Sequence, residues 1–370
     1  MSKTLADEME TGSDVFGFDA MRGVQAGREY YVAMCPMKII PKLFVFTEID
    51  LPAEVRAQRV IRESRIPAIT NYIINNPEDY VFSALTASVD GKMRFSPSPG
   101  GGEDGKLGRL YISMNSKLLI NDGQHRRRAI EEALKVRPEM GNETISVVFF
   151  QDKGLRRSQQ MFADLNKHAV KPTTSLGILY DHHDEYSQFI VRLASTVDVF
   201  RNRVELEQTS ISNRSTKFFT LSGISAATKF LLDGNTKDFP PETEKLVIEY
   251  WNEITRNIPD WRNLMEDKVT AGELRKYYIH AHSNILGTLG IIGAILLKEY
   301  PDSWKEKLQA LQNLPWERTD PKWEGRLAIQ GRMNKTKIGM QLAANTILTE
   351  MNVPLSEERQ KFEEKAKGNV

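Results

Sequence analysis

The residue types best suited to chemistry stand together in one short stretch, Asp122-Gly123-Gln124-His125-Arg126. It lies between a predicted strand and a predicted helix, where a glycine permits a tight reversal and a close backbone approach to a ligand. The first N–H groups of a helix have no partner within the helix, and the helix dipole favours an anion there. His125 and Arg126 add donors that suit phosphate. We therefore expect these five residues to form a phosphate- or nucleotide-binding pocket.

The same stretch has a plainer interpretation, in which Asp122 caps the helix and Gly123 makes the turn. The run Arg126 to Arg128 argues against simple capping, because three cations at a helix N-terminus oppose the dipole unless an anion lies nearby. We expect Arg127 and Arg128 to contact DNA phosphate. The sequence alone does not decide between capping and phosphate binding.

A second group follows the predicted helix 155–165. Asn166, His168 and Lys171 would fold back over the phosphate pocket, and an ordinary helix cap with a loop is the alternative. Arg156 and Arg157 begin that helix, where cations again oppose the dipole. We expect these two arginines to contact DNA, and a solvated helix face is the alternative.

Basic and polar side chains gather at two more places. Residues 212–217 combine hydroxyl, amide and cationic groups, which is typical of phosphate contacts, although such a loop can also cap the next helix. Residues 328–340 carry three cations and no acid. The DNA-contacting residues expected here are Arg214, Lys217, Arg332, Lys335 and Lys337. A further stripe of arginines at spacing three would follow one helix face, towards phosphate or solvent: Arg56, Arg59, Arg62 and Arg65.

No metal site is expected. Cys35 is the one cysteine, so the chain can form neither an internal disulfide nor a cysteine zinc site. The adjacent His182 and His183 diverge on a helix or a strand, so one ion rarely takes both. We expect Cys35 to be a buried apolar side chain, with a redox-responsive thiol as the alternative. The sequence has no Walker A motif and no nucleophile elbow.

Composition limits the partners. The chain has 370 residues, with 50 Lys and Arg against 49 Asp and Glu, a formal net charge of +1. A polybasic coat that binds nucleic acid by bulk charge is excluded, so any such contact needs a local patch. The most apolar run, residues 285–297, is shorter than the ~20 residues that span a bilayer. We expect a cytoplasmic protein without a membrane partner.

These residues need elements to position them. Residues 1–28 show little periodicity and predict a flexible leader, residues 29–152 mix strands with helices, and residues 153–370 are mainly helical. The expected fold class is α+β, a small mixed sheet with a larger helical domain. Strands are expected at 29–37, 39–46, 80–89, 109–114, 117–121 and 145–150, with 109–114 and 117–121 forming a hairpin. Helices are expected at 51–65, 69–74, 124–134, 155–165, 187–194, 221–232, 243–257, 272–297, 303–311 and 335–352, before a frayed tail at 361–370.

Several of these segments occur in the order of a known family. The stretch NDGQHR, preceded by RIPAI and YIINNPEDYVFSALTASVDG and followed by FADLNKHAVKP, resembles the DGQHR-domain proteins, and in particular the DndB family of DNA sulfur modification proteins. The resemblance covers roughly residues 29–180. It implies a ParB/sulfiredoxin-like domain, in which a motif ending in arginine cradles nucleotide phosphates at a strand-to-helix turn.

The resemblance also implies a function. A DndB-type protein is expected to bind double-stranded DNA in the promoter region of a phosphorothioation operon, as a negative regulator and a homo-oligomer, and not to transfer sulfur itself. The alternative is a nucleotide-binding or nucleotide-hydrolysing switch. Its cofactor would be a nucleoside triphosphate with Mg²⁺ positioned by Asp122 or Asn166.

Overall fold

The computed structural model describes residues 15–44, 62–99, 105–151, 160–161, 164–165, 172–212, 214–237, 240–334 and 336–367. The chain divides into two compact units, Met1–Val170 and Lys171–Val370. The division therefore falls later than the boundary at residue 152 that composition indicated. The two units are described separately below. In the described part of the chain, no helix is both long enough and apolar enough to cross a membrane.

A seven-stranded sheet organises the first unit, in the order β4-β5-β1-β2-β7-β3-β6. All neighbours are antiparallel except β3 and β7. The strands are β1 Val15–Gln25, β2 Arg28–Pro36, β3 Leu85–Asp90, β4 Met93–Pro97, β5 Leu107–Ser113, β6 Lys117–Asp122 and β7 Thr144–Gln151. This mixed sheet and the helices below confirm the α+β class.

Two expectations about strands are wrong. The predicted leader 1–28 contains β1 and the start of β2, because Phe18 and Ala20 alternate into the core although glycines interrupt the pattern. The predicted hairpin of β5 with β6 does not form: β5 pairs with β1 and β4, and β6 pairs with β3. Both strands have the right pattern, but long-range burial selects partners that local spacing does not reveal.

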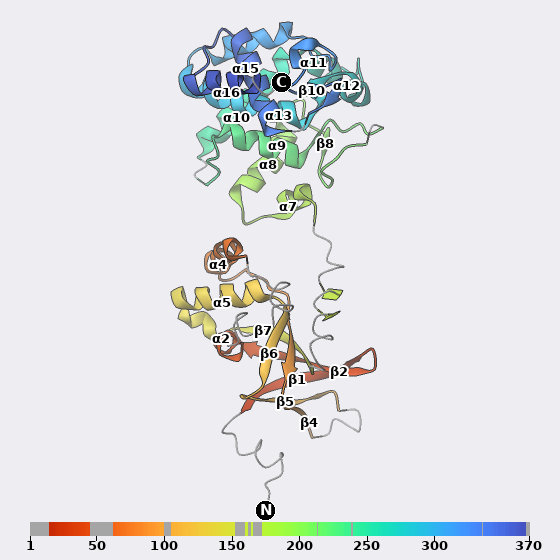
Figure 1. Ribbon diagram of the computed structural model, residues 1–370, viewed down its shortest axis with the longest axis vertical. Helices are drawn as coiled ribbons and strands as arrows, with labels where there is room; N and C mark the ends of the chain where they lie inside the picture. Colours follow the sequence, from red (N-terminus) through yellow and green to blue (C-terminus); the bar gives the residue numbers. More distant parts are fainter. Residues whose placement is uncertain are drawn as a thin grey trace, which may run out of the picture. The chain divides into compact units, whose positions relative to one another are not determined.

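Helices cover one face of this sheet (Figure 1). They are α2 Ile40–Leu43, α4 Ile66–Asn75 and α5 Gln124–Val136, with short 3-10 turns at Met37–Ile39, Glu63–Arg65 and Pro138–Asn142. The strand expected at 39–46 is therefore helical as far as Leu43, since Ile40 and Leu43 are buried one turn apart. Both pack against inward-facing strand residues such as Val147.

The second unit is mainly helical. Its helices are α7 Thr174–Tyr180, α8 Glu185–Thr196, α9 Leu221–Leu231, α10 Pro241–Asn257, α11 Pro259–Met265, α12 Ala271–Tyr277, α13 Ser283–Glu299, α14 Trp304–Leu308, α15 Lys337–Glu350 and α16 Glu357–Lys367. Two-residue strands pair as β8 Val204–Glu205 with β9 Phe219–Thr220, and β10 Ala328–Ile329 with β11 Arg332–Met333. The core contains the fully buried side chains of Trp251, Trp261 and Trp323.

Helix α13 lies against α9 and α15. A Cβ at Gly290 would lie 2.2 Å from the Ala227 carbonyl oxygen, so glycine is what permits this close approach. The single helix predicted over 272–297 is interrupted by a 3-10 turn at Ile279–Ala281. Residues 361–367 of the tail predicted to fray belong to α16, where Glu363 pairs with Arg326 at 2.8 Å.

Candidate functional site

The strand-to-helix corner forms where the sequence places it. Strand β6 ends at Asp122, α5 begins at Gln124, and Gly123 between them has φ of +102°. A Cβ at this position would lie 2.4 Å from Cδ2 of Leu85. The left-handed backbone and the contact with β3 therefore both require glycine.

Arg126 folds back over this turn. Its Nη2 lies 2.7 Å from Oδ2 of Asp122, and its Nη1 donates to the carbonyl oxygens of Ser83 at 2.7 Å and Ala84 at 2.9 Å, as well as to the Ser83 hydroxyl. The side chain is only 16% exposed. The guanidinium thus ties the corner to the chain entering β3. Asp122 does not cap α5, because its carboxylate is engaged by Arg126.

The next two arginines are neutralised by the protein itself. Arg127 lies 2.7 Å from Glu131 and donates to the Phe44 carbonyl at 3.0 Å, while Arg128 pairs with Glu131 at 2.6 Å and Glu132 at 3.2 Å. Glu131 and Glu132, one turn later in α5, thus supply the negative charge that a cationic helix N-terminus needs. In this arrangement Arg127, 18% exposed, presents little of its side chain to DNA.

Backbone donors nevertheless remain at the start of α5. Among the described residues, none accepts a hydrogen bond from the N–H groups of Gln124, His125 or Arg126. The Nε2 of His125 accepts from the Arg62 N–H at 3.0 Å, and burial, then the charges of Arg65 and Arg62, lower the pKa of His125. The corner therefore combines three amides that have no acceptor among the described residues with an imidazole of lowered pKa and two exposed arginines.

Other predicted residues lie outside the described part of the chain, namely Asn166, His168, Lys171, Arg156, Arg157, Lys335, Arg56 and Arg59. Cys35 is described and fully buried, and burial raises the pKa of its thiol to about 12. A thiol held protonated in this way is a poor nucleophile, which favours the apolar interpretation. In the described ranges no three His, Cys, Asp or Glu side chains come together as a metal site.

In the second unit, the structure joins two stretches that the sequence treated separately. Arg275, only 7% exposed, donates to the carbonyl oxygens of Ser212 at 3.0 Å and Ser215 at 2.7 Å, and to that of Lys217. Asn284 donates to the carbonyl oxygen of Asn334, just after β11. Ser212, Ser215 and Lys217 are therefore joined to α12, and the end of the β10–β11 hairpin is joined to α13.

A cavity of about 430 Å³ lies next to both contacts, lined by residues that include Thr209, Ser210, Arg275, His282, Asn284 and Met333. Behind it, Nη2 of Arg318 lies 2.9 Å from Nε2 of His282 and also donates to the Arg275 carbonyl oxygen. Burial lowers the pKa of Arg275 and of Arg318. One guanidinium group in the lining and a second in contact with that lining make the cavity a suitable place for an anion.

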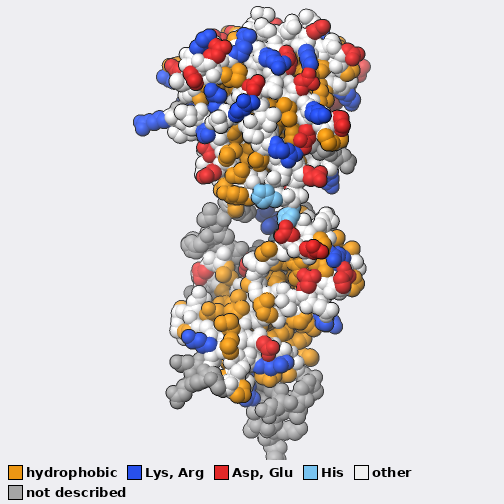
Figure 2. Space-filling view, turned by 180° about the vertical axis from the view of Figure 1, so that it is seen from behind, with side chains coloured by type: hydrophobic (Ala, Val, Ile, Leu, Met, Phe, Trp, Pro, Cys, Tyr) orange, Lys and Arg blue, Asp and Glu red, His pale blue; other side chains and the backbone are white. Residues whose placement is uncertain are grey.

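Cations lie in the two stretches next to this cavity, but none of them is among its lining residues. Within the described residues, Arg214, Arg332 and Lys337 form no ion pair, and Nζ of Lys217 donates to the Asn202 carbonyl oxygen at 3.1 Å. Charges of both signs are interspersed on the face of this unit that Figure 2 shows. The sequence analysis missed Arg275, His282 and Arg318, because no motif or regular spacing marks side chains that only the fold brings together.

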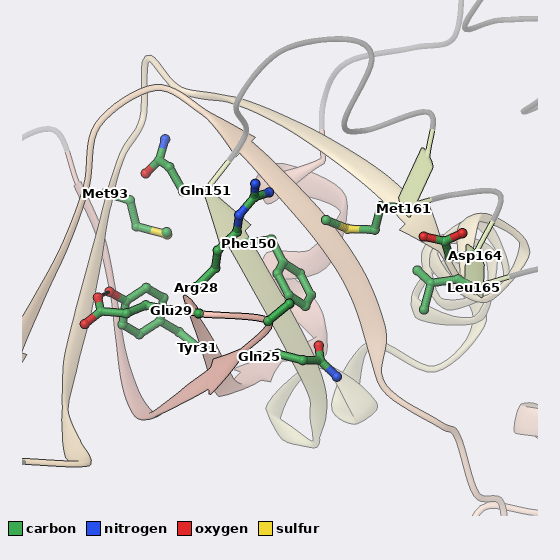
Figure 3. A pocket seen from close by; sticks show the side chains of 12 residues that line it. Gln25, Arg28, Glu29, Tyr31, Met93, Phe150, Gln151, Met161, Asp164 and Leu165 are labelled. Atoms are coloured by element: carbon green, nitrogen blue, oxygen red, sulfur yellow. Dashed lines mark hydrogen bonds between the residues drawn. The ribbon is translucent and has the colours of Figure 1, made fainter.

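The first unit has a larger cavity of about 630 Å³, between the β1–β2 turn, β4 and the end of β7. In Figure 3 the Arg28 side chain extends among Phe150, Gln151 and Met161, and Asp164 lies beyond Met161. Met161 also accepts from the buried Asn121 amide at 3.1 Å. None of the residues predicted from the sequence lines this cavity, and Arg28, Glu29 and Asp164 give its lining mixed charge.

Comparison with known proteins gives one result. A family model named DndB, described as DNA-sulfur modification-associated, matches residues 18–354. No curated protein and no solved structure matches the chain. The ParB/sulfiredoxin-like assignment of the first unit therefore stays a prediction.

Proposed function

The chain belongs to the DndB family of DNA-sulfur modification-associated proteins, and from this premise we propose that it is a DNA-binding negative regulator of the operon that carries out the modification. A single cysteine with a raised pKa offers no relay of paired thiols, so sulfur transfer is not part of the proposal. The ligand proposed for its basic surface is the phosphate backbone of a DNA duplex in the promoter region.

One observation supports this function above the others. Arg275 lines a cavity and also holds the carbonyl oxygens of Ser212, Ser215 and Lys217 in one basic stretch, and Met333 of the second basic stretch lines the same cavity. Arginine, lysine, hydroxyl and amide groups are the side chains that contact phosphate oxygens in protein–DNA complexes. Because the whole chain has a formal charge of only +1, a local surface of this kind is what DNA binding requires.

Retardation of DNA by the purified full chain tests the proposal. The chain should retard a duplex taken from upstream of its own modification operon at lower concentration than an unrelated duplex of equal length. It should also reduce expression of a reporter placed behind that upstream sequence. Equal retardation of both duplexes, or an unchanged reporter, would contradict a regulator that recognises its operator.

The corner at Gly123 supports a second candidate function, a nucleotide-dependent switch. The three amides at the start of α5, together with the exposed Arg62 and Arg65, could hold a triphosphate whose Mg²⁺ Asp122 would help to position. Arg126 would first have to leave its contacts with Asp122 and Ser83.

Calorimetric titration with ATP or CTP and Mg²⁺ separates the two functions. Binding that Arg65→Ala weakens and Arg256→Ala leaves unchanged would support the switch, since Arg256 is an exposed arginine of the second unit paired with Glu253. Absence of heat with either nucleotide would leave the DNA-binding proposal intact and remove the switch.

A further inference from the structure

The sheet of the first unit has a second face, opposite to α2, α4 and α5. Strand register places Leu107 of β5, Met21 of β1 and Val32 of β2 in one row across the sheet, and Val148 of β7 continues it. Residues directly opposite each other in neighbouring strands point to the same side. Their chain neighbours Ala20 and Ala33 are buried beneath the helices, so this row points away from the core.

Several large apolar side chains on this face are exposed. Met21 is 58% exposed, Leu107 59% and Met34 55%. Beside them, Arg109 and Asp19 lie opposite each other in register, with 3.8 Å between Nη1 and Oδ1, and are 55% and 94% exposed. We call these residues the outer patch: Asp19, Met21, Val32, Met34, Leu107 and Arg109. Hydrophobic side chains are also frequent on the surface of this unit in Figure 2.

The chemistry of the outer patch favours a protein partner over a nucleic acid. Methionine and arginine are enriched in protein interfaces and lysine is depleted, and the outer patch has two methionines, one arginine and no lysine. Asp19 balances Arg109, so the outer patch lacks the positive excess that a phosphate backbone needs. Exposed apolar surface that lies together in this way is a common sign of a protein contact.

Charge selects the partner. An acid and a base side by side form a surface that complements itself, because a two-fold axis brings Asp19 of one copy to Arg109 of the other. Met21 and Leu107 lie in the neighbouring row, where the same axis would bring the two apolar rows together. We propose that the chain forms a dimer in which the outer patches of two copies pack face to face. Dimer formation through this surface does not depend on DNA binding.

Sedimentation velocity of the full chain, from low to high micromolar concentration, tests the dimer. Met21→Lys places a charge in the centre of the contact and should raise the dissociation constant by about tenfold or more. Val136→Lys is the matched control, since Val136 is 64% exposed at the end of α5 and outside the outer patch. Circular dichroism checks that both variants are folded.

Charge reversal identifies the partner as a second copy. Asp19→Arg and Arg109→Asp should each weaken the dimer, and the double variant should restore it, because the pairs across the axis are then exchanged. A wild-type chain that stays monomeric, or Met21→Lys and Val136→Lys dimers of equal strength, would overturn the proposal. Failure of the double variant to recover would exclude the face-to-face arrangement.

Discussion

The guanidinium of Arg126 lies against Gly123 and reaches the carboxylate of Asp122 at 2.7 Å, so the first, second and last residues of the DGQHR stretch form one closed turn. Asp122 and Arg126, which were both expected to bind a ligand, therefore contact each other. This contact holds the corner in shape and leaves the amides of α5 as its open donors.

Arg126→Ala should destabilise the first unit by about 1–3 kcal/mol, because the carbonyl oxygens of Ser83 and Ala84 and the Asp122 carboxylate lose a partly buried partner. Urea denaturation followed by circular dichroism measures this. Arg94→Ala, an exposed arginine of the same sheet, is the control and should change stability little. Equal effects of the two substitutions would show that the turn does not depend on Arg126.

Gly123→Ala should cost about 1–3 kcal/mol, since the residue would have to keep φ near +102° with its Cβ against Leu85. Gly177→Ala is a useful contrast because Gly177 lies in α7 with open space around its Cβ position. That substitution should stabilise its helix by up to about 1 kcal/mol. Thermal melts in which Gly123→Ala is neutral would contradict the geometry of the corner.

The second unit should lose stability as the pH falls below about 6.5. Burial lowers the pKa of His280 more than Asp260 raises it, and Nδ1 accepts from the Trp261 indole at 3.2 Å, which only a neutral ring can do. As the pH falls, His280 therefore takes up a proton in the unfolded chain before it does so in the folded chain. The contribution of neutral His280 to the free energy of unfolding is fully present above the pKa of His280 in the unfolded chain, and it is lost as the pH falls below that pKa.

Tryptophan fluorescence during denaturation at pH 8 and pH 5 measures this, because all five tryptophans belong to the second unit: Trp251, Trp261, Trp304, Trp316 and Trp323. His280→Asn should be less stable at pH 8, and its disadvantage relative to the wild type should shrink at pH 5. A constant difference between the two proteins would exclude His280 as the source of the pH dependence.

Cys35 should not react with a thiol reagent at pH 8 in the folded chain. It is fully buried, and its pKa of about 12 keeps the thiol protonated. Addition of guanidinium chloride should expose the thiol and restore a rapid reaction. Fast labelling of the native protein would instead favour the redox-responsive alternative.

Local pattern predicted the elements better than it predicted their partners. Helix α5 and strands β5, β6 and β7 lie where hydrophobic periodicity placed them, because each depends on its own alternation of apolar residues. The order of the strands in the sheet could not be predicted from the same periodicity, since β5 and β6 are neighbours in sequence but pair with different strands. Burial against distant strands decides such pairing.

In the candidate sites, too, local features could be predicted from the sequence and long-range contacts could not. Gly123 was predictable from its place between a strand and a helix, whereas the internal use of Arg126 depends on Ser83 and Ala84, which are distant in sequence. Likewise the two basic stretches of the second unit could be found from composition. The cavity that Arg275 and Met333 line together could not, because one buried arginine has no signature in the sequence.

The salt dependence of DNA binding tests the central proposal most directly. Affinity of the wild type for the upstream duplex should fall linearly with salt on a double logarithmic plot, and the Arg214→Ala, Arg332→Ala double variant should lower that slope by about 2. The control is Arg201→Ala with Arg256→Ala, which removes two exposed arginines already paired with Asp198 and Glu253, and it should keep the wild-type slope. Identical slopes for all three proteins, or no binding at low salt, would contradict DNA recognition by this surface.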